Sequence, residues 1–472
     1  MIAFDLLFFI GLYLLGTIYI GWWASKKVKT TADFVVAGKN LPMIVAAFAL
    51  FATWFGSETV LGASSEFIEN GLIGVIEDPF GAALCLFLSG RLLSKPLYRL
   101  NLLTFGDYYR IRYNRKVELV SSVLMIPSYF GWIAAQLVAL GIILQSISGL
   151  PISYGIFICA IVVTIYTYIG GMWAVSITDF VQTIIIIIGL LAILIIVLND
   201  AGGLVKVLTT AHTENNDFFN FFPKERSLKE WLEYFTAWIT LGLGSLPQQD
   251  IFQRVMAAKS EKDSENAAYL SAFMYLTIAF IPLLIALCSK QLYPNLALNN
   301  LQMLLPNMVN QHFGLFMKIL FFGALLSAIL STTSGAILAP ATVLGENIIK
   351  PYYKNLNDKS LMKIIRLSIL LIAAISCIMA NLNANIYELV SQSSALSLVG
   401  LFTPLLFGLY WKKSNSMGAM FSMIIGTITW LVLLNFETTF PPTLIALISS
   451  IISMMIFSNI KWLIHFGHKH SN

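Results

Sequence analysis

The sequence predicts an all-helical (all-α), polytopic protein that crosses a lipid bilayer about thirteen times. Of its 472 residues, 58% are hydrophobic and only 11% are charged. A membrane-spanning helix needs roughly 20 mostly apolar residues, and many separate stretches of this chain meet that requirement. The predicted spans are 4–23, 43–64, 72–94, 117–147, 153–172, 176–198, 231–252, 265–288, 312–345, 363–380, 386–411, 416–436 and 440–460.

The basic residues predict how these spans are oriented. Lys and Arg lie almost entirely in or beside every second connection and in the C-terminal tail. The exceptions are Lys206, Lys224, Arg226, Lys229, Lys290 and Lys318. Because cytoplasmic connections are enriched in basic residues, we expect the N-terminus outside and the C-terminus in the cytoplasm. The expected location is the inner (plasma) membrane, with the lipid bilayer around the protein.

Composition and motifs argue against several other classes of protein. The longest connection, 199–230, is too short to build a soluble core of its own. The net charge of +5 follows from the cytoplasmic basic excess and does not indicate a nucleic-acid partner. The cysteines lack metal-ligand spacing and no Gly-rich nucleotide loop occurs, so we expect no enzyme activity, no cofactor and no metal beyond a coupling ion. An ion channel is the alternative from another class, but no repeated filter segment supports it.

Two spans contain polar and helix-breaking residues near mid-depth. The span 43–64 includes Gly-Ser-Glu-Thr at 56–59, and the span 231–252 includes Leu-Gly-Leu-Gly-Ser-Leu-Pro-Gln-Gln-Asp at 241–250. Unwound backbone at this depth is tolerated only where it is buried in protein or lines a polar cavity. Interrupted spans at matching places in two halves of a chain are typical of the midplane site of a secondary transporter. Two kinked structural helices are the simpler alternative.

The interrupted spans also predict how the chain is organised. Each is the first of five consecutive spans, and the two groups of five begin in opposite directions across the membrane, which predicts an inverted repeat. The expected segments are a first helix with a cytoplasmic loop (1–42), a first repeat (43–198), an extracytoplasmic loop (199–230), a second repeat (231–411), and two C-terminal helices with a short cytoplasmic tail (412–472).

The span 312–345 carries a stripe of hydroxyl side chains. Ser327, Ser331 and Ser334 share one helical face, and Thr332 follows Ser331 directly. Such hydroxyls often only hydrogen-bond to the preceding turn or join neighbouring helices. A hard cation such as Na⁺ also prefers neutral hydroxyl and carbonyl oxygens, and a broken helix frees backbone carbonyls. The stripe and a broken helix together predict a cation site.

Three motifs resemble the sodium:solute symporter family, which includes proline, pantothenate, sugar, sialic-acid and choline carriers. They are Tyr-Thr-Tyr-Ile-Gly-Gly-Met-Trp-Ala-Val-Ser-Ile-Thr-Asp-Phe-Val-Gln at 166–182, the pair Gln253-Arg254, and the segment 402–419. The resemblance runs from about the second span to the twelfth. It implies a LeuT-type core of two inverted five-helix repeats with two broken helices, which takes up a small organic solute with Na⁺ by alternating access. H⁺ is the alternative coupling ion.

The resemblance also implies which residues bind sodium. The hydroxyls of Ser331 and Thr332 match the coordinating pair of the family. The set is completed by the backbone carbonyls of Ala52, Phe55 and Ala328. Asp179 matches an aspartate that the family places on the cytoplasmic side of the sodium path.

The chain resembles the choline-carrier branch in particular. The shared residues include Trp132 and the segments 52–54, 79–81, 95–96 and 251–254. Trp54 stands where the proline carriers have an aspartate, which argues against proline. Trp54 and Trp132 can present π faces to a quaternary ammonium, each contributing on the order of 1–2 kcal/mol when desolvated. Two aromatic positions of that branch are Ala82 and Gln248 here, so both a quaternary amine and an amino acid stay open as solutes.

Three acids distinguish the chain from the choline branch, namely Glu58, Glu77 and Asp78. An acid inside a membrane is costly and is a functional candidate by default. Glu58 has three possible roles: to offset a substrate cation, to bind a coupling ion, or to pair with Arg91. We expect Glu77 and Asp78 near the membrane edge in structural roles. The expected substrate-binding residues are Trp54, Glu58, Trp132 and Gln248.

Overall fold

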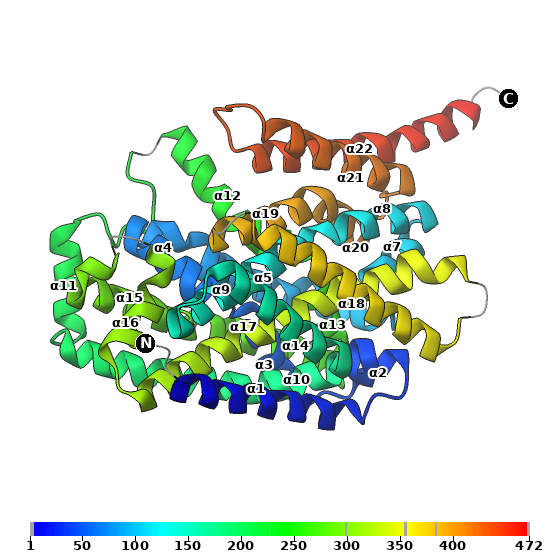
Figure 1. Cartoon of the computed structure of the whole chain (residues 1–472). Coiled ribbons are helices and arrows are strands. Elements are labelled where there is room, and N and C mark those ends of the chain that lie inside the picture. Colours follow the sequence, from blue (N-terminus) through cyan, green and yellow to red (C-terminus); the bar gives the residue numbers. More distant parts are fainter. Residues whose placement is uncertain (1–3, 226, 298–299, 354–355, 383–384, 470–472) are drawn as a thin grey trace.

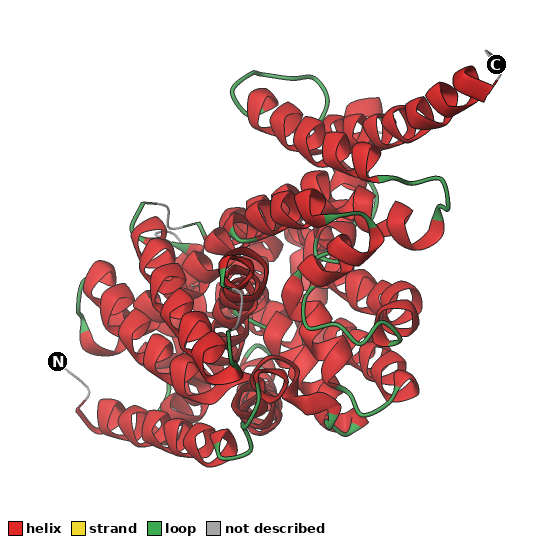
Figure 2. Ribbon diagram, turned by 90° about the vertical axis from the view of Figure 1, so that its right-hand side faces the viewer, coloured by secondary structure: helices red, strands yellow, loops and turns green. Residues whose placement is uncertain are grey.

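The computed structural model describes residues 4–225, 227–297, 300–353, 356–382 and 385–469. Arg226 of the long connection therefore lies outside the described residues. Within these ranges the chain is almost entirely helical, and its only strand-like pairing is an isolated bridge between Leu41 and Ala258 (Figure 2). The all-α class predicted from the sequence is confirmed.

The first predicted broken span is interrupted where the sequence indicated. α3 (Met43–Trp54) begins after Pro42, and the chain becomes helical again at Glu58. The continuing α4 (Ala63–Asn70) ends at Gly71, whose φ of +69° favours glycine. The other helices of this half are α1 (Phe4–Ser25), α2 (Thr31–Val36), α5 (Ala82–Leu88), α6 (Lys95–Tyr98), α7 (Phe105–Arg112), α8 (Arg115–Met125), α9 (Phe130–Ser148) and α10 (Ile152–Asp200).

The second predicted broken span is divided into α12 (Leu228–Gly244) and α13 (Gln249–Ala257), which the non-helical residues 245–248 separate. The proline and glycines of this segment explain the interruption, because neither residue favours a helix interior. The other helices of this half are α11 (Leu204–Glu214), α14 (Glu261–Ile278), α15 (Phe280–Leu292), α16 (Leu304–His312), α17 (Leu315–Val343), α18 (Asp358–Ala380), α19 (Ile386–Ser397), α20 (Thr403–Tyr410), α21 (Ser416–Leu433) and α22 (Pro442–Lys469).

The number of membrane spans differs from the prediction. In the part of the chain that the structure describes, ten helices are long and apolar enough to cross a membrane. Two further apolar helices, Met43–Trp54 and Ile152–Ile165, are shorter. The count of about thirteen is therefore not confirmed. Part of the difference comes from the interruptions in the predicted spans 43–64 and 231–252, because a broken helix supplies shorter pieces instead of one continuous span.

The breaks of the two interrupted helices are surrounded by other helices. α3 packs against α10, α14 and α17, and α13 packs against both α3 and α17. α1 runs along α10 at one edge, and α21 pairs with α22 at another, with α22 extending away from the other helices (Figure 1). The interrupted backbone is thus enclosed by protein, where unwound segments are tolerated.

Candidate functional site

The break in α3 places free backbone groups in the protein interior. Trp54 is the last helical residue, and Phe55 leaves the helical conformation with φ −84° and ψ +74°. The Ser57 N–H then donates to Oε1 of Gln136 on α9, at 2.9 Å. A side chain of a neighbouring helix therefore satisfies one backbone group that the break leaves without a helical partner.

Gly56 sits at the narrowest point of this break. A Cβ at this position would lie 2.6 Å from Oε2 of Glu58, 2.7 Å from Oγ1 of Thr332 and 2.8 Å from Oε1 of Gln136. Atoms in proteins do not approach a Cβ this closely, so only glycine leaves room for the three oxygens. The carboxylate, hydroxyl and amide oxygens consequently converge on bare backbone.

The second break packs against α19. The hydroxyls of Ser245 and Ser394 lie 3.2 Å apart. Gly244 approaches the same segment so closely that a Cβ would lie 2.4 Å from the carbonyl oxygen of Ser394. Gln248 directly precedes α13. The polar residues of this break thus face a helix from the end of the second predicted repeat.

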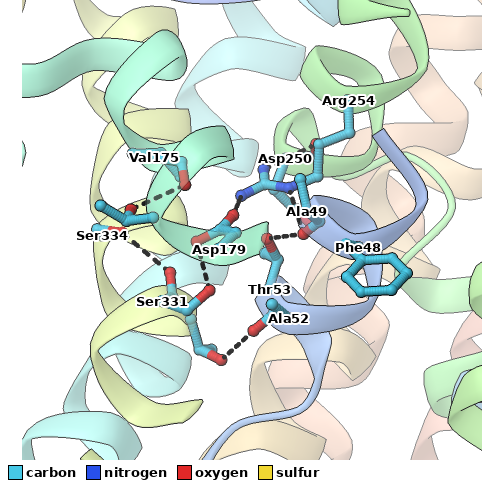
Figure 3. Close-up of polar contacts among 12 residues, drawn as sticks. Phe48, Ala49, Ala52, Thr53, Val175, Asp179, Asp250, Arg254, Ser331 and Ser334 are labelled. Atoms are coloured by element: carbon cyan, nitrogen blue, oxygen red, sulfur yellow. Dashed lines mark hydrogen bonds and ion pairs between the residues drawn. The ribbon is translucent and has the colours of Figure 1, made fainter. Parts of the chain in front are cut away.

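The predicted sodium-binding residues gather where α17 meets α3. The Thr332 hydroxyl donates to the carbonyl oxygen of Ala52 at 3.2 Å (Figure 3). Ser331 precedes Thr332, and Ala328 lies one turn earlier on the same helix. Phe55 directly follows α3, and all five residues are at most 1% exposed. The Thr332 hydroxyl and the Ala52 carbonyl, from two helices, therefore meet without contact with solvent.

Asp179 on α10 connects this region to α13. Its Oδ1 accepts a hydrogen bond from Ser331 at 2.5 Å, and its Oδ2 lies 3.7 Å from Nη2 of Arg254 (Figure 3). Arg254 also donates to the carbonyl oxygens of Ala49 at 3.2 Å and of Asp250 at 3.3 Å. Sequence reasoning used Arg254 only as part of a motif. Two of its three partners could not be foreseen, because Asp179 and Ala49 lie on other helices.

The four predicted substrate-binding residues line one small pocket, whose cavity of about 10 Å³ is roughly the size of a single water site. The rings of Trp54 and Trp132 meet edge to face, with centroids 6.3 Å apart. Glu58 and Gln248 lie next to the two helix breaks. The pocket therefore lies where the breaks meet. Its other lining residues are Asp78, Leu241, Ser245, Tyr275, Val390, Ser393 and Ser394.

Carboxylates accept hydrogen bonds from the N–H groups of both indole rings. Trp54 Nε1 donates to Oδ2 of Asp250 at 3.0 Å. Trp132 Nε1 donates to Oε1 of Glu58 at 2.9 Å, and Gln136 Nε2 donates to the other oxygen of Glu58 at 2.7 Å. An indole has only this one polar group. With its N–H bound, each ring has only apolar surface left for other contacts.

The structure shows the surroundings of the three acids. Asp78 is 2% exposed and lines the pocket, and Thr59 and Tyr275 donate to its Oδ2 at 2.9 and 3.1 Å. Its expected position near the membrane edge stays a prediction. The possible pairing of Glu58 with Arg91 does not occur, since Trp132 and Gln136 bind Glu58 and Arg91 is exposed. Glu77 is half-buried and accepts a hydrogen bond from Ser391 at 3.2 Å.

Sequence reasoning missed Tyr275 and Ser393 as residues of the pocket. The Tyr275 hydroxyl oxygen lies 2.9 Å from the carbonyl oxygen of Trp54, and Ser393 Oγ accepts from the backbone N–H of Trp132 at 3.0 Å. Neither residue stands beside a proline or glycine that would interrupt its helix. No local signal marks them, because their role arises only from packing between distant helices.

Comparison with known proteins identifies related transporters. The model of the family described as "Sodium:solute symporter family" matches residues 34–426. High affinity choline transporter 1 of Homo sapiens is 26% identical over 428 residues, which cover 86% of this chain and 73% of that protein. The osmoregulated proline transporter OpuE of Bacillus subtilis (strain 168) is 28% identical over 453 residues, which cover 91% and 89%.

Solved structures share the fold. A Na⁺-coupled sialic acid symporter in a substrate-bound outward-open state has a TM-score of 0.83 at 20% identity, covering 97% of this chain and 98% of that one. MhsT in complex with L-phenylalanine has a TM-score of 0.57 at 13% identity, covering 89% and 98%. These likenesses confirm the predicted LeuT-type fold class.

Proposed function

The chain belongs to the sodium:solute symporter family, and we propose that Na⁺ binds where α17 meets the broken end of α3. As a member of this family, the protein is a membrane transporter that couples a small solute to Na⁺, and it is not an enzyme. The contact between the Thr332 hydroxyl and the Ala52 carbonyl carries the proposal most directly. The other proposed ligands are the Ser331 hydroxyl and the carbonyls of Phe55 and Ala328.

The chemistry of these groups suits a hard monovalent cation. A hydroxyl can turn its proton away from a carbonyl and offer a lone pair instead. Carbonyls freed by a broken helix are frequent Na⁺ ligands in transporters with discontinuous helices. Thr332 and Ala52 can therefore exchange their mutual hydrogen bond for two contacts with one ion. H⁺ remains the alternative coupling ion for this site.

Asp179 is proposed to lie on the path by which the ion leaves toward the cytoplasm. Ser331 is common to the proposed sodium site and to the hydrogen bond with Asp179. An ion that moves away from Ser331 therefore meets a carboxylate next. Arg254 balances the charge of Asp179 when no ion is near, which would keep Na⁺ from being held there too tightly.

The break in α3 provides the coupling between ion and solute. Ala52 and Phe55 belong to the proposed sodium site, whereas Trp54 and Glu58 of the same break line the pocket. Na⁺ that orders this backbone also orders the pocket wall. By linkage, each ligand then raises the affinity of the other by the same factor, typically about 5- to 150-fold.

The proposed solute pocket is formed by Trp54, Glu58, Trp132 and Gln248. The relatives carry choline and proline in their names, so a quaternary amine and an amino acid are the two starting candidates. The paired indoles favour a solute with an apolar or cationic portion. Glu58 lines the same pocket, and its carboxyl group argues against an anionic solute.

The membrane arrangement is proposed as follows. The segments 43–198 and 231–411 form the two inverted repeats, and 199–230 is the extracytoplasmic connection. The segment 1–42 precedes the repeats, and 412–472 adds two helices and a cytoplasmic tail. The N-terminus faces outward in the inner (plasma) membrane. The distribution of Lys and Arg supports this orientation.

A thermal-unfolding experiment in lipid nanodiscs tests the sodium site. NaCl is compared with KCl at equal ionic strength, and Na⁺ at 100 times its dissociation constant should add about 2.7 kcal/mol of stability. The double variant Ser331→Ala, Thr332→Ala should unfold cooperatively without this Na⁺ effect. Thr333→Ala is the matched control, because the Thr333 hydroxyl donates to Ile329 of its own helix. A double variant with the wild-type Na⁺ response would refute the site.

A further inference from the structure

The pocket between the two breaks contains two acids and no basic side chain. Glu58 and Asp78 are among its lining residues, and all the others are aromatic, aliphatic, hydroxyl or amide side chains. Glu58 is 3% exposed and Asp78 is 2% exposed. A carboxylate in such surroundings is unfavourable by several kcal/mol unless a cation or hydrogen bonds compensate it.

The protein itself supplies no cation to these acids. Within the described ranges, neither Glu58 nor Asp78 forms an ion pair. Asp179, a buried acid beside the proposed sodium site, does have a basic partner, because it lies 3.7 Å from Arg254. Their partners within the described ranges are hydrogen-bond donors, so a cation that enters the pocket would meet two acids that no basic side chain already pairs.

One oxygen of Asp78 also lacks a hydrogen-bond donor. Its Oδ2 accepts from Thr59 and Tyr275, which fixes the orientation of the carboxylate. Its Oδ1 is buried and has no partner among the described residues. A buried acceptor without a donor is destabilising. A ligand that fills the pocket can correct this only if it brings a donor of its own.

Resting on the proposed transport function, we propose that the solute is a small protonated amine with at least one N–H group. The ammonium donates to Oδ1 of Asp78, and the charge of Glu58 adds to its attraction. The apolar portion of the solute lies against Trp54 and Trp132. A quaternary ammonium satisfies the charge but has no N–H to donate, so it leaves Oδ1 of Asp78 without a partner. Anionic solutes are repelled by both acids.

Matched pairs of probes test this inference on the wild-type protein. Nanodisc-embedded protein in NaCl is mixed with ethanolamine, 1,4-diaminobutane or butylamine, and separately with the N-trimethylated counterpart of each. Thermal unfolding is recorded as a function of probe concentration. At least one primary amine should stabilise the protein, and its trimethylated counterpart should act about ten- to hundredfold more weakly, as expected for a lost hydrogen bond to a charged group.

Substitutions of the two acids test which carboxylate accepts the hydrogen bond from the amine. Asp78→Asn should remove the preference for the primary amine, and Glu58→Gln should weaken both members of each pair. Asp217→Asn is the matched control, because this exposed carboxylate pairs with Lys224 in the connection before α12. The Lys224 hydrogen bond lowers the pKa of Asp217, so the control also removes a negative charge at neutral pH. If Asp78→Asn fails to fold, the wild-type series and Glu58→Gln still decide.

Three outcomes overturn the inference. In the first, no primary amine stabilises the protein. In the second, the trimethylated amine binds as well as or better than the primary amine in every pair that stabilises the protein, and in the third only neutral or anionic solutes stabilise it. The Na⁺ response without solute separates this failure from that of the proposed function. If Na⁺ alone stabilises the protein through Ser331 and Thr332, the symport proposal stands while the amine is rejected.

Discussion

Replacing Asp179 by Asn separates the charge of this residue from its shape. The amide has nearly the same size and can still accept the hydrogen bond from Ser331, but it no longer balances Arg254. Arg254 is 2% exposed, and removing one partner of a buried ion pair costs about 3–5 kcal/mol. The ion pair is long at 3.7 Å, and Arg254 keeps the carbonyls of Ala49 and Asp250. We therefore expect a loss of about 3 kcal/mol.

The assay is thermal unfolding of the nanodisc-embedded protein over a series of Na⁺ concentrations. Asp179→Asn should lower the stability without Na⁺ and raise the Na⁺ concentration of half-maximal stabilisation several-fold. Asp217→Asn, which removes an exposed acid, should change neither quantity. A loss below about 1 kcal/mol would contradict the dependence of Arg254 on Asp179. An unchanged Na⁺ midpoint would remove Asp179 from the ion path.

Two further sets of substitutions test the pocket and the break. Trp54→Ala should weaken binding of the stabilising solute far more than Trp54→Phe, and Trp132→Ala should likewise weaken it far more than Trp132→Phe. Titration of the solute against folded protein measures the affinity. An unchanged affinity would show that the indoles only pack between helices. Gly56→Ala should abolish the Na⁺ response in the unfolding assay, because its Cβ would lie 2.7 Å from Oγ1 of Thr332. Gly16→Ala on α1 is the control and should keep that response, because no atom lies within 4 Å of the added Cβ. An equal Na⁺ response of the two alanine variants would disprove the steric argument.

Apolar length predicted most of the fold, because a bilayer allows few structures other than continuous helices. Each predicted span overlaps a described helix, and the breaks after Trp54 and Gly244 fall inside the segments that the sequence indicated. Helix boundaries were harder to predict. The predicted spans 153–172 and 176–198 form one long element with a kink at Gly171, whose φ is +56°. Hydropathy alone does not distinguish such a kink from a loop.

The candidate site was predictable only in part. Trp54, Glu58 and Gln248 lie beside helix breaks, which the local sequence indicates. Trp132 came from the family resemblance. The place of Asp78 in the pocket was not predicted, because its partner Tyr275 lies on a helix almost two hundred positions later in the chain. Contacts of this kind depend on how α14 packs on α3 and on the segment before α5, and a single sequence does not contain that information.

The side chains that join α3 to α13 limit how the protein can move. Trp54 binds Asp250, and Arg254 binds the carbonyl of Ala49, both in the buried interior. Each of these bonds involves a charged group, so separating the two helices would cost about 1.5–3 kcal/mol per bond. We therefore expect α3 and α13 to rotate as one rigid unit. The contact between Ser245 and Ser394 joins two neutral hydroxyls. Because such a hydrogen bond is weaker than one to a charged group, the pocket is expected to open there first.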